Sequence, residues 1–358
     1  MKKILFSAYS LDVGGIETAL ITLLKYLKDE YEITLVLEKK QGIFLKDLPK
    51  EINVITYRPS SIKFPIIRKL LNFAKQVNFK RKYKNKFDFA ADFATYSMPA
   101  SFVSRTASKN CAIWIHNNYM NFYDNNITQY RNFFNKLKIS KFKKIVFVSD
   151  LDRKVFIAQF PELTKNTIVC NNLINYERIE KLAKEKIEEK KEDIPTFINV
   201  GRHDEKQKKI SRIISATEKL NKQGYKFRVL LVGKGTASKE YENIIKEKKL
   251  NNILMLGAKK NPYPYFKISD CFLLSSQFEG YPVVFVESQI LNLPIITTDV
   301  SDSKKDIAGK YGIVVENSEK GVYKGMKEFL DKGIKTEKFD PEKFNEEIAE
   351  KVRKIINA

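Results

Sequence analysis

Two glutamates eight positions apart flank a proline in the segment EGYPVVFVES. Glu279 follows a short apolar run, and Glu287 lies in a stretch that we expect to be helical, with Pro282 in its first turn. Free backbone N–H groups at a helix start can receive a phosphate, and flanking carboxylates can accept hydrogen bonds from sugar hydroxyls. The amides expected to be free are those of Gly280, Tyr281, Val283 and Val284. Either acid could instead be an ordinary surface residue, although apolar neighbours argue against this for Glu287.

A second group is basic and lies between an apolar run and a helical segment, in INVGRHDEKQKKISRIISA. Arg202 ends the run, and Lys208 follows six positions later. A guanidinium can bind two phosphate oxygens and an ammonium acts as a point charge, so together they can clamp two linked phosphates. In so lysine-rich a chain, the alternative is a solvated basic loop. His203, next to Arg202, is interpreted as an ordinary loop residue.

Two features in the first third of the chain could also contact a ligand. Gly14 and Gly15 follow the first apolar run and precede a helical segment, so the backbone can approach an anion there. They do not form the GxGxxG fingerprint, and an ordinary tight turn explains them equally well. His116 ends the run CAIWIHN, where a ligand-facing residue belongs, although a histidine there could simply cap the strand.

All these residues follow short apolar runs, which alternate with amphipathic segments along the chain. Such nearly continuous runs are typical of strands covered on both faces. A charged stretch, ERIEKLAKEKIEEKKEDIP, separates two series and is interpreted as a solvated helix at a hinge. We therefore predict an α/β fold of two Rossmann-like, doubly wound domains facing across a cleft, with ligands at the carboxyl ends of the strands. The predicted domains are residues 1–176 and 177–340, and the helical segment 341–358 is a candidate to pack back on the first domain.

The composition limits the class of protein. With 358 residues, 43% of them hydrophobic, the chain can bury two cores, which excludes a disordered protein. Three well-separated cysteines argue against a disulfide framework or a cysteine-rich zinc site and fit a reducing cytoplasm. No apolar run is long enough to span a bilayer, and the start, MKKILFSAYSL, is interpreted as a first strand rather than a signal peptide. The formal net charge of +22 favours a phosphate-rich partner.

Several motifs resemble those of the retaining glycosyltransferases of family 4, which are nucleotide-sugar-dependent enzymes of the GT-B fold. The most specific is Glu279-x7-Glu287 within EGYPVVFVES, followed by NLPIITTDV. The others are GGIE near the start, WIH, NNLIN, VGR with its downstream lysine, VGKG and LGAKKNPYPYF. The resemblance covers essentially the full length and is strongest from residue 196 to 300.

On the donor side, the resemblance implies that Arg202 and Lys208 bind the diphosphate. Glu279 would hold hydroxyls of the donor sugar, and Glu287 would hold the ribose. The donor loop departs from the family pattern, because QKK replaces the commoner single lysine plus glycine. Whether Lys206 or Lys208 reaches the phosphates is therefore open, and the phase of the following helix favours Lys208.

The same resemblance implies roles for residues nearer the acceptor and the base. Gly15, together with Gly14, would approach the phosphate or the acceptor, and His116 would lie beside the sugar. The stretch from Gly257 to Asn261 would lie near the base.

The implied reaction is the retaining transfer of a hexosyl or N-acetylhexosaminyl group from a nucleoside-diphosphate sugar, with a UDP-sugar favoured, to an acceptor hydroxyl. The resemblance also implies front-face substitution, in which the leaving phosphate helps to deprotonate the acceptor, and no residue stands out as an enzymic nucleophile. Neither a cofactor nor a metal is expected, because the clamp and the helix amides can stabilise the leaving group. Asp150-Leu151-Asp152 mimics a DxD metal motif, but the preceding Ser149 indicates a helix capping box instead.

Two basic segments suggest contact with an anionic membrane surface. Residues 62–86 contain nine Lys or Arg, no acid and apolar residues at helical spacing, and residues 131–144 repeat the theme. An ordinary helix covering the sheet would explain the apolar stripe but not the missing acids. We therefore expect a cytoplasmic protein bound peripherally to the inner face of the membrane, with a lipid-linked or cell-envelope polysaccharide precursor as acceptor.

Two other functions are compatible with parts of this pattern. A non-catalytic GT-B partner subunit would keep the fold but lose the clamp or the acid pair, and both are present here. A nucleic-acid-binding protein would explain the net charge, but the chain lacks an aromatic-basic recognition motif, so no nucleic-acid partner is expected.

Overall fold

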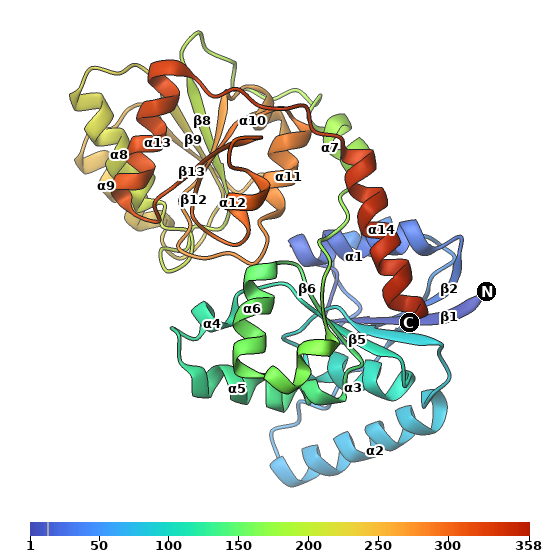
Figure 1. The fold of residues 1–358 in the computed structure, drawn as a ribbon. Coiled ribbons are helices and arrows are strands. Elements are labelled where there is room, and N and C mark those ends of the chain that lie inside the picture. Colours follow the sequence, from blue (N-terminus) through green and yellow to red (C-terminus); the bar gives the residue numbers. More distant parts are fainter. Residues whose placement is uncertain (13) are drawn as a thin grey trace. The chain divides into compact units, whose positions relative to one another are not determined.

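The computed structural model describes residues 1–12 and 14–358, which divide into two compact units (Figure 1). Unit 1 comprises Met1–Ile174 and Glu342–Ala358, and unit 2 comprises Asn175–Pro341. The chain therefore leaves unit 1 once and returns to it with its last helix.

The sheet of unit 1 is parallel and seven-stranded, in the order β3-β2-β1-β4-β5-β6-β7. Its strands are β1 (Lys2–Ala8), β2 (Tyr31–Leu37), β3 (Asn53–Thr56), β4 (Phe89–Asp92), β5 (Cys111–Ile115), β6 (Lys144–Phe147) and β7 (Thr167–Val169). Ile4 of β1 lies opposite Ile33 of β2 on one side and Phe89 of β4 on the other. The strand order reverses between β1 and β4, and ligands bind at such a point in doubly wound sheets.

Helices cover both faces of this sheet, because alternate strand residues point to opposite sides. They are α1 (Gly15–Leu27), α2 (Pro65–Tyr83), α3 (Met98–Ala107), α4 (Tyr119–Phe122), α5 (Ile127–Lys136), α6 (Asp150–Gln159) and α14 (Pro341–Asn357), with short 3-10 helices at η1 (Ile43–Asp47), η2 (Ile139–Lys141) and η3 (Pro161–Asn166). Phe6 of β1 packs in one core with α1 and α14, whereas Leu5 packs in another with α3. The helical segment predicted at the end of the chain thus completes the first core.

Unit 2 repeats this plan with a six-stranded parallel sheet in the order β10-β9-β8-β11-β12-β13. Its strands are β8 (Thr196–Val200), β9 (Arg228–Val232), β10 (Ile253–Gly257), β11 (Cys271–Leu274), β12 (Ile295–Thr298) and β13 (Gly312–Val315). Its helices are α7 (Tyr176–Leu182), α8 (Ser211–Lys222), α9 (Ser238–Glu247), α10 (Tyr263–Lys267), α11 (Val283–Ile290), α12 (Ser303–Asp306) and α13 (Glu319–Lys332). α8, α9 and α13 pack on one face, and α10 and α11 pack on the other. The strand order reverses between β8 and β11.

The predicted doubly wound α/β fold is confirmed, and each expected strand is present, including the first. The charged stretch is helical only over α7, so its interpretation as a solvated helix holds up to Leu182 and is wrong beyond it. Residues 184–193, KEKIEEKKED, contain a single apolar residue, Ile187, and a helix there would have no apolar face to bury. Of the helices within residues 1–12 and 14–358, none is both long enough and apolar enough to cross a bilayer.

Candidate functional site

In unit 2, the predicted donor residues lie at the carboxyl ends of β8 and β11, where the sheet changes direction. Arg202 lies two residues beyond β8, and Glu279 lies in the loop that follows β11. Because the two strands are hydrogen-bonded neighbours, residues 77 positions apart in the sequence converge on one edge of the sheet. This edge is the expected ligand site of a doubly wound domain.

Lys208 and Glu279 form an ion pair at this edge. The Lys208 Nζ donates to Glu279 Oε1 at 2.6 Å, and the two side chains are only 16% and 9% exposed. The Ser276 hydroxyl donates to the same oxygen at 2.6 Å, and the Gln207 amide donates to Oε2 at 3.2 Å. The Glu279 carboxylate is therefore fixed by three donors, whereas the Lys206 side chain is exposed to solvent.

Arg202 stays close to this network without joining it. The Lys208 side chain passes Gly201, and its Cε lies 3.5 Å from where a Cβ on that glycine would be. Arg202 is exposed, and within the described part of the chain its guanidinium forms no ion pair. The loop thus combines one cation held by a carboxylate with one cation that is still available.

The segment that follows β9 approaches the loop of Arg202 closely. A Cβ on Gly233 would lie 1.8 Å from the Gly201 carbonyl oxygen, and Gly233 has φ +152°, so only glycine fits. A Cβ on Gly235 would lie 2.2 Å from the His203 carbonyl oxygen. His203 itself is fully buried, with its Nδ1 2.9 Å from the Ser238 hydroxyl. It lies in a loop, as interpreted from the sequence, and anchors that loop to the start of α9.

Glu287 lies on α11, the helix that follows the loop containing Glu279 and Gly280. Its Oε1 accepts a hydrogen bond of 2.9 Å from the Tyr263 hydroxyl, and burial raises the pKa of its carboxyl to about 7. α11 begins at Val283 after the N-cap Pro282, so its first amides have no helical acceptor. Within the described residues, neither the Val283 N–H nor the Val284 N–H donates a hydrogen bond.

The remaining predicted donor residues differ in how they are placed. Tyr281 is half-buried beside Phe285, with ring centroids 6.5 Å apart. Gly257 ends β10 at φ +69°, with open space where a side chain would be. The Asn261 amide donates to Leu182 O and to Glu185, both at 2.8 Å, and so tethers α7 instead of facing open space.

In unit 1, Gly14 is the N-cap of α1, and Gly15 is the first residue of that helix. A Cβ on Gly14 would lie 2.2 Å from Glu17 Oε2, so this position is restricted to glycine unless that side chain moves. Burial raises the pKa of the Glu17 carboxyl. The glycines follow β1, one of the two strands between which the strand order of unit 1 reverses.

His116 follows β5 and lies against Phe93, with ring centroids 4.6 Å apart. Its Nδ1 is 3.4 Å from the amide nitrogen of Asn172, in the NNLIN motif. Its Nε2 is buried and has no hydrogen-bond partner among the described residues. Burial lowers the pKa of the ring to about 3, so His116 is neutral at physiological pH.

The sequence missed several residues that organise these strand ends. In unit 1, Asp92 ends β4 completely buried, receives hydrogen bonds from the Ser101 hydroxyl and the Ala94 amide, and has a pKa raised by burial to about 7. In unit 2, Arg212 holds the loop after β11 by donating to Ser275 O at 3.0 Å and to Gln277 at 2.6 Å. Asp92 could have been found from the sequence, because it is a polar residue at the end of a buried strand. No feature of the sequence around Arg212 indicates its role.

The DxD-like triplet forms a helix start. Ser149 accepts a hydrogen bond from the Asp152 amide at 3.3 Å, so the predicted N-cap is confirmed. Asp150 pairs with Arg153 at 3.0 Å and with Lys154 at 2.9 Å. Across residues 1–12 and 14–358, no group of three His, Cys, Asp or Glu side chains is arranged to hold a metal ion.

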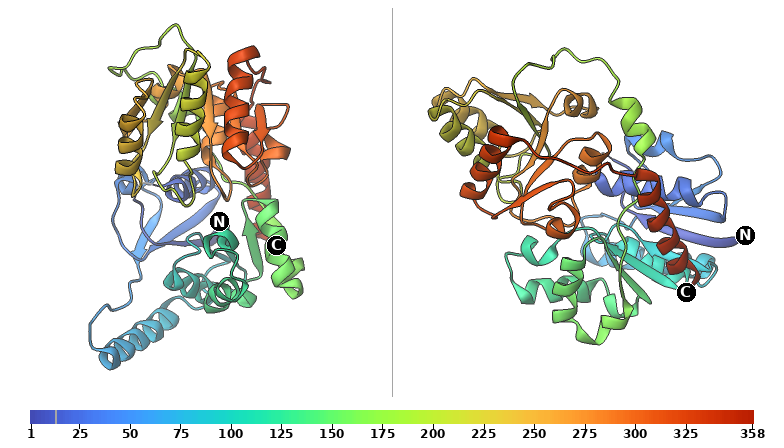
Figure 2. Two further views of the ribbon diagram at one scale, coloured as in Figure 1. Left: turned by 90° about the vertical axis from the view of Figure 1, so that its left-hand side faces the viewer. Right: turned by 45° about the horizontal axis from the view of Figure 1, so that its top comes forward.

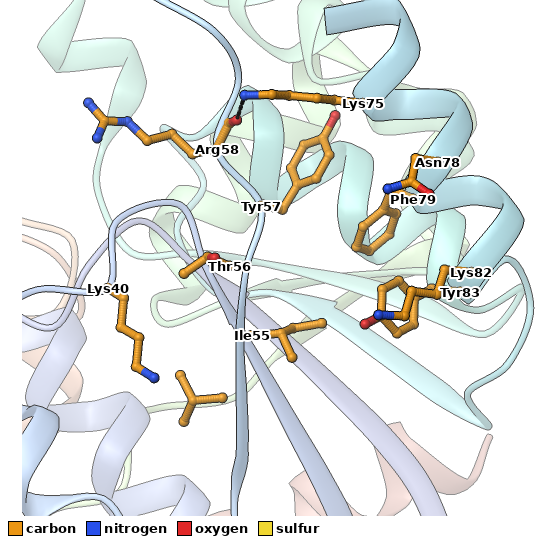
Figure 3. A pocket seen from close by; sticks show the side chains of 11 residues that line it. Lys40, Ile55, Thr56, Tyr57, Arg58, Lys75, Asn78, Phe79, Lys82 and Tyr83 are labelled. Atoms are coloured by element: carbon orange, nitrogen blue, oxygen red, sulfur yellow. Dashed lines mark hydrogen bonds between the residues drawn. The ribbon is translucent and has the colours of Figure 1, made fainter.

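A hollow of about 640 Å³ lies in unit 1 between β3 and α2, away from the predicted site residues (Figure 3). Four cations and no acid line it: Lys40, Arg58, Lys75 and Lys82. Tyr57, Phe79 and Tyr83 form its apolar part. The Lys75 ammonium donates to the Arg58 carbonyl oxygen across it, at 2.9 Å.

Residues 180–355 match the family model described as glycosyl transferases group 1. The chain is 25% identical over 344 residues to the N-acetylgalactosamine-N,N'-diacetylbacillosaminyl-diphospho-undecaprenol 4-alpha-N-acetylgalactosaminyltransferase of Campylobacter jejuni, covering 92% of this chain and 91% of that protein. It is 27% identical to the uncharacterized glycosyltransferase MJ1059 of Methanocaldococcus jannaschii, covering 57% of this chain and about half (55%) of that protein. Its fold matches the crystal structure of Anabaena Alr3699/HepE in complex with UDP and glucose, with a TM-score of 0.78 and 18% identity over 99% of this chain and all of that one. The fold is therefore GT-B, with two Rossmann-like units.

Proposed function

We propose, because residues 180–355 match the family model of the glycosyl transferases of group 1, that this chain is a retaining, family 4 enzyme. Its donor would be a nucleoside-diphosphate sugar, with UDP favoured, and its acceptor a hydroxyl of a lipid-linked or polysaccharide precursor. The observation that carries this proposal is the Lys208–Glu279 pair beside the open amides of α11.

The cationic loop supports binding of the donor diphosphate. Lys208 and Arg202 lie on the loop after β8, and the N–H groups of Val283 and Val284 open the helix that follows the neighbouring β11. Two cations and a helix N-terminus can neutralise the charge that develops on a leaving diphosphate. The same groups make metal independence our expectation.

The two glutamates support recognition of the two sugars of the donor. Glu279 is held by Lys208, Ser276 and Gln207, which leaves further lone pairs on its oxygens for hydroxyls of the transferred sugar. Burial raises the pKa of the Glu287 carboxyl, because little water can hydrate the carboxylate. Two hydroxyls of a ribose would donate the hydrogen bonds that water does not supply there. We assign Glu279 to the donor sugar and Glu287 to the ribose.

For the acceptor, the long match with the Campylobacter enzyme favours a saccharide on a polyprenyl diphosphate. His116 would hydrogen-bond a sugar hydroxyl through its neutral Nε2. No described residue is placed as a nucleophile on the donor edge of unit 2, which favours front-face substitution with the leaving phosphate accepting the acceptor proton.

The decisive experiment incubates the full chain with a panel of nucleotide sugars and a synthetic polyprenyl-diphosphate saccharide. We expect thermal stabilisation by one class of donor, of about 2.7 kcal/mol at a hundred times its dissociation constant. We expect transfer with retention of the anomeric configuration, unaffected by EDTA. Inversion, or a strict metal requirement restored by adding Mg²⁺ or Mn²⁺, would refute this mechanism. Donor binding without any transfer would favour the non-catalytic subunit.

A further inference from the structure

Helix α2 turns a continuous apolar face to solvent. Its side chains at Ile66, Leu70, Phe73 and Val77 are between 47% and 77% exposed, and Phe79 is the one residue of the helix that is buried. Steps of four, three and four residues place these four side chains on one stripe of the helix. Ile67 and Leu71 extend the stripe and are also exposed. A soluble surface rarely leaves so many large apolar groups together without a partner.

Cations border this stripe on both sides. The helix carries six of them and no acid, and no Asp or Glu occurs anywhere between Glu51 and Asp88. At 100° per residue, Lys69 and Lys80 fall along one edge of the stripe, and Arg68 and Lys82 fall beyond the other. None of the six forms an ion pair within residues 1–12 and 14–358. The positive charge of the helix is therefore uncompensated by the protein.

The rest of unit 1 holds α2 by its opposite side, and mainly near its end. Phe79 packs against Tyr57, Phe102 and Tyr83, at centroid distances of 5.0, 5.9 and 4.9 Å. The hollow described above separates part of the helix from β3 (Figure 3). In Figure 1 and in the left view of Figure 2, the helix extends outward from the body of unit 1. α2 therefore does not cover the sheet with its apolar stripe, which was the alternative to a membrane-binding helix.

We infer that α2 is an interfacial helix that lies on an anionic bilayer, with its apolar stripe among the acyl chains and its flanking cations at the head groups. An amphipathic helix of this kind buries its apolar face at the head-group boundary and gains affinity from each nearby cation. Charge selects this occupant over a second copy of the chain, because two such helices would bring twelve cations together without a single acid. The inference concerns where the protein works and does not depend on the proposed reaction.

The test is flotation of the full chain with vesicles of phosphatidylcholine alone or with about a third phosphatidylglycerol. We expect binding to the anionic vesicles at low ionic strength, at least tenfold weaker binding in about 0.5 M salt, and none to neutral vesicles. The quadruple variant R68Q/K69Q/K80Q/R81Q should lower the partition coefficient by roughly a hundredfold or more, since each cation contributes several-fold. A matched variant of unit 2, K226Q/K246Q/K267Q/K320Q, removes the same charge from exposed positions and should bind as the wild type does.

Insertion of the stripe is tested separately from charge. I66S/L70S/F73S keeps every cation and should still lose binding at least tenfold, with an unchanged melting temperature because these side chains are exposed. In the F73W variant, brominated lipids should quench the new fluorophore, whereas in N72W, at a position that faces away from the stripe and bonds the Ser60 amide, they should not. The native Trp114 is buried and gives the constant background.

Three outcomes would overturn the inference. The first is failure of the wild type to bind anionic vesicles at low salt. The second is equal loss of binding in the unit 2 control, which would make attraction a property of net charge alone. The third is concentration-dependent dimerisation abolished by I66S/L70S/F73S, which would make a second copy the partner. Stabilisation by donor nucleotide, measured on the same variants, should stay at the wild-type value, so failure of this inference is distinguishable from failure of the proposed reaction.

Discussion

The strand ends of the two units hold their polar groups in different ways. In unit 2, charges are paired: Glu279 is fixed by Lys208, and Arg202 stays exposed next to them. In unit 1, burial shifts the pKa values toward the neutral forms: that of His116 is lowered to about 3, and that of Asp92 is raised to about 7. One edge is thus built to face charge, and the other is built to face uncharged hydroxyls.

This difference shows that two units with the same strand order can specialise through the residues that follow their strands. A paired, polarised edge stabilises a highly charged ligand without reorganising, whereas a desolvated edge discriminates through hydrogen bonds to neutral groups. The following predictions test whether the division is functional, from the largest expected effect to the smallest.

The largest effect is expected from breaking the charge pair in unit 2. Lys208→Met should reduce turnover by about 10²- to 10³-fold, because the cation that we propose to bind the leaving diphosphate is lost. It should also lower the free energy of unfolding by about 2–3 kcal/mol, because it leaves the nearly buried Glu279 carboxylate without its cation. Steady-state kinetics and denaturant unfolding measure the two effects independently.

A double variant separates these two effects. Adding Glu279→Gln to Lys208→Met should restore most of the stability and none of the turnover, since the unpaired charge is removed but the clamp is not rebuilt. Lys206→Met is the matched control two positions away, and its turnover should stay within about twofold of wild type, as for other exposed surface lysines. Equal damage from Lys206→Met would transfer the clamp to that residue.

A smaller effect is expected in unit 1. His116→Asn should lower turnover by roughly five- to fiftyfold while leaving nucleotide affinity unchanged, because a neutral hydrogen bond is weaker than a charged one. With a pKa near 3, His116 does not titrate between pH 5 and 8, so the pH–rate profile of the variant should run parallel to that of the wild type. If the pH dependence of turnover on one side of the optimum disappeared in His116→Asn, the imidazole would have to act in its protonated form.

The smallest effect is a pH dependence of donor affinity that arises from Glu287. Its carboxyl has a pKa of about 7 in the folded protein, so about a tenth is ionised at pH 6 and about nine tenths at pH 8. If ribose binds the carboxylate, a nucleotide sugar should bind about tenfold more tightly at pH 8 than at pH 6, and Glu287→Gln should remove this difference. Titration calorimetry with an intact nucleotide sugar avoids the terminal phosphate of a free nucleoside diphosphate, which itself ionises in this range.

The same shift predicts how stability changes with pH. The folded protein keeps the Glu287 proton up to about pH 7, whereas the unfolded chain releases it near 4.5. The contribution of this group to the free energy of unfolding therefore falls as pH rises between these values. Glu287→Gln should remove that decline, leaving the one expected from Asp92, whose pKa is raised in the same direction.

The strands were predicted well from the sequence, because strands buried on both faces consist of nearly continuous runs of apolar residues. The sequence also placed Arg202, Lys208 and Glu279 at strand ends. It could not predict that Gln207 and Ser276 complete the Glu279 network, since this depends on how two loops far apart in the chain fold against each other.

The two basic segments show the limit of periodicity most clearly. Both 62–86 and 131–144 combine cations with apolar residues, yet the second buries Phe134, Leu137 and Phe142 in the core of unit 1, while α2 leaves its stripe exposed. An apolar helix face indicates that the helix packs against another surface. Whether that surface belongs to the same protein depends on tertiary packing, which cannot be predicted from a local sequence pattern.

The division of unit 1 into two stretches of chain has a consequence for its biosynthesis. Ile348, Val352 and Ile355 of α14 belong to the core that also contains Ile4 and Phe6, and the Asn345 side chain bonds both the amide and the carbonyl of Ile174. On the ribosome, unit 1 cannot close this core until residues 342–358 have been made, whereas unit 2 is one uninterrupted stretch and is complete earlier. The unit encoded second is therefore the first able to finish folding, and the nascent first unit must wait, with part of its core uncovered, until residues 342–358 have been made.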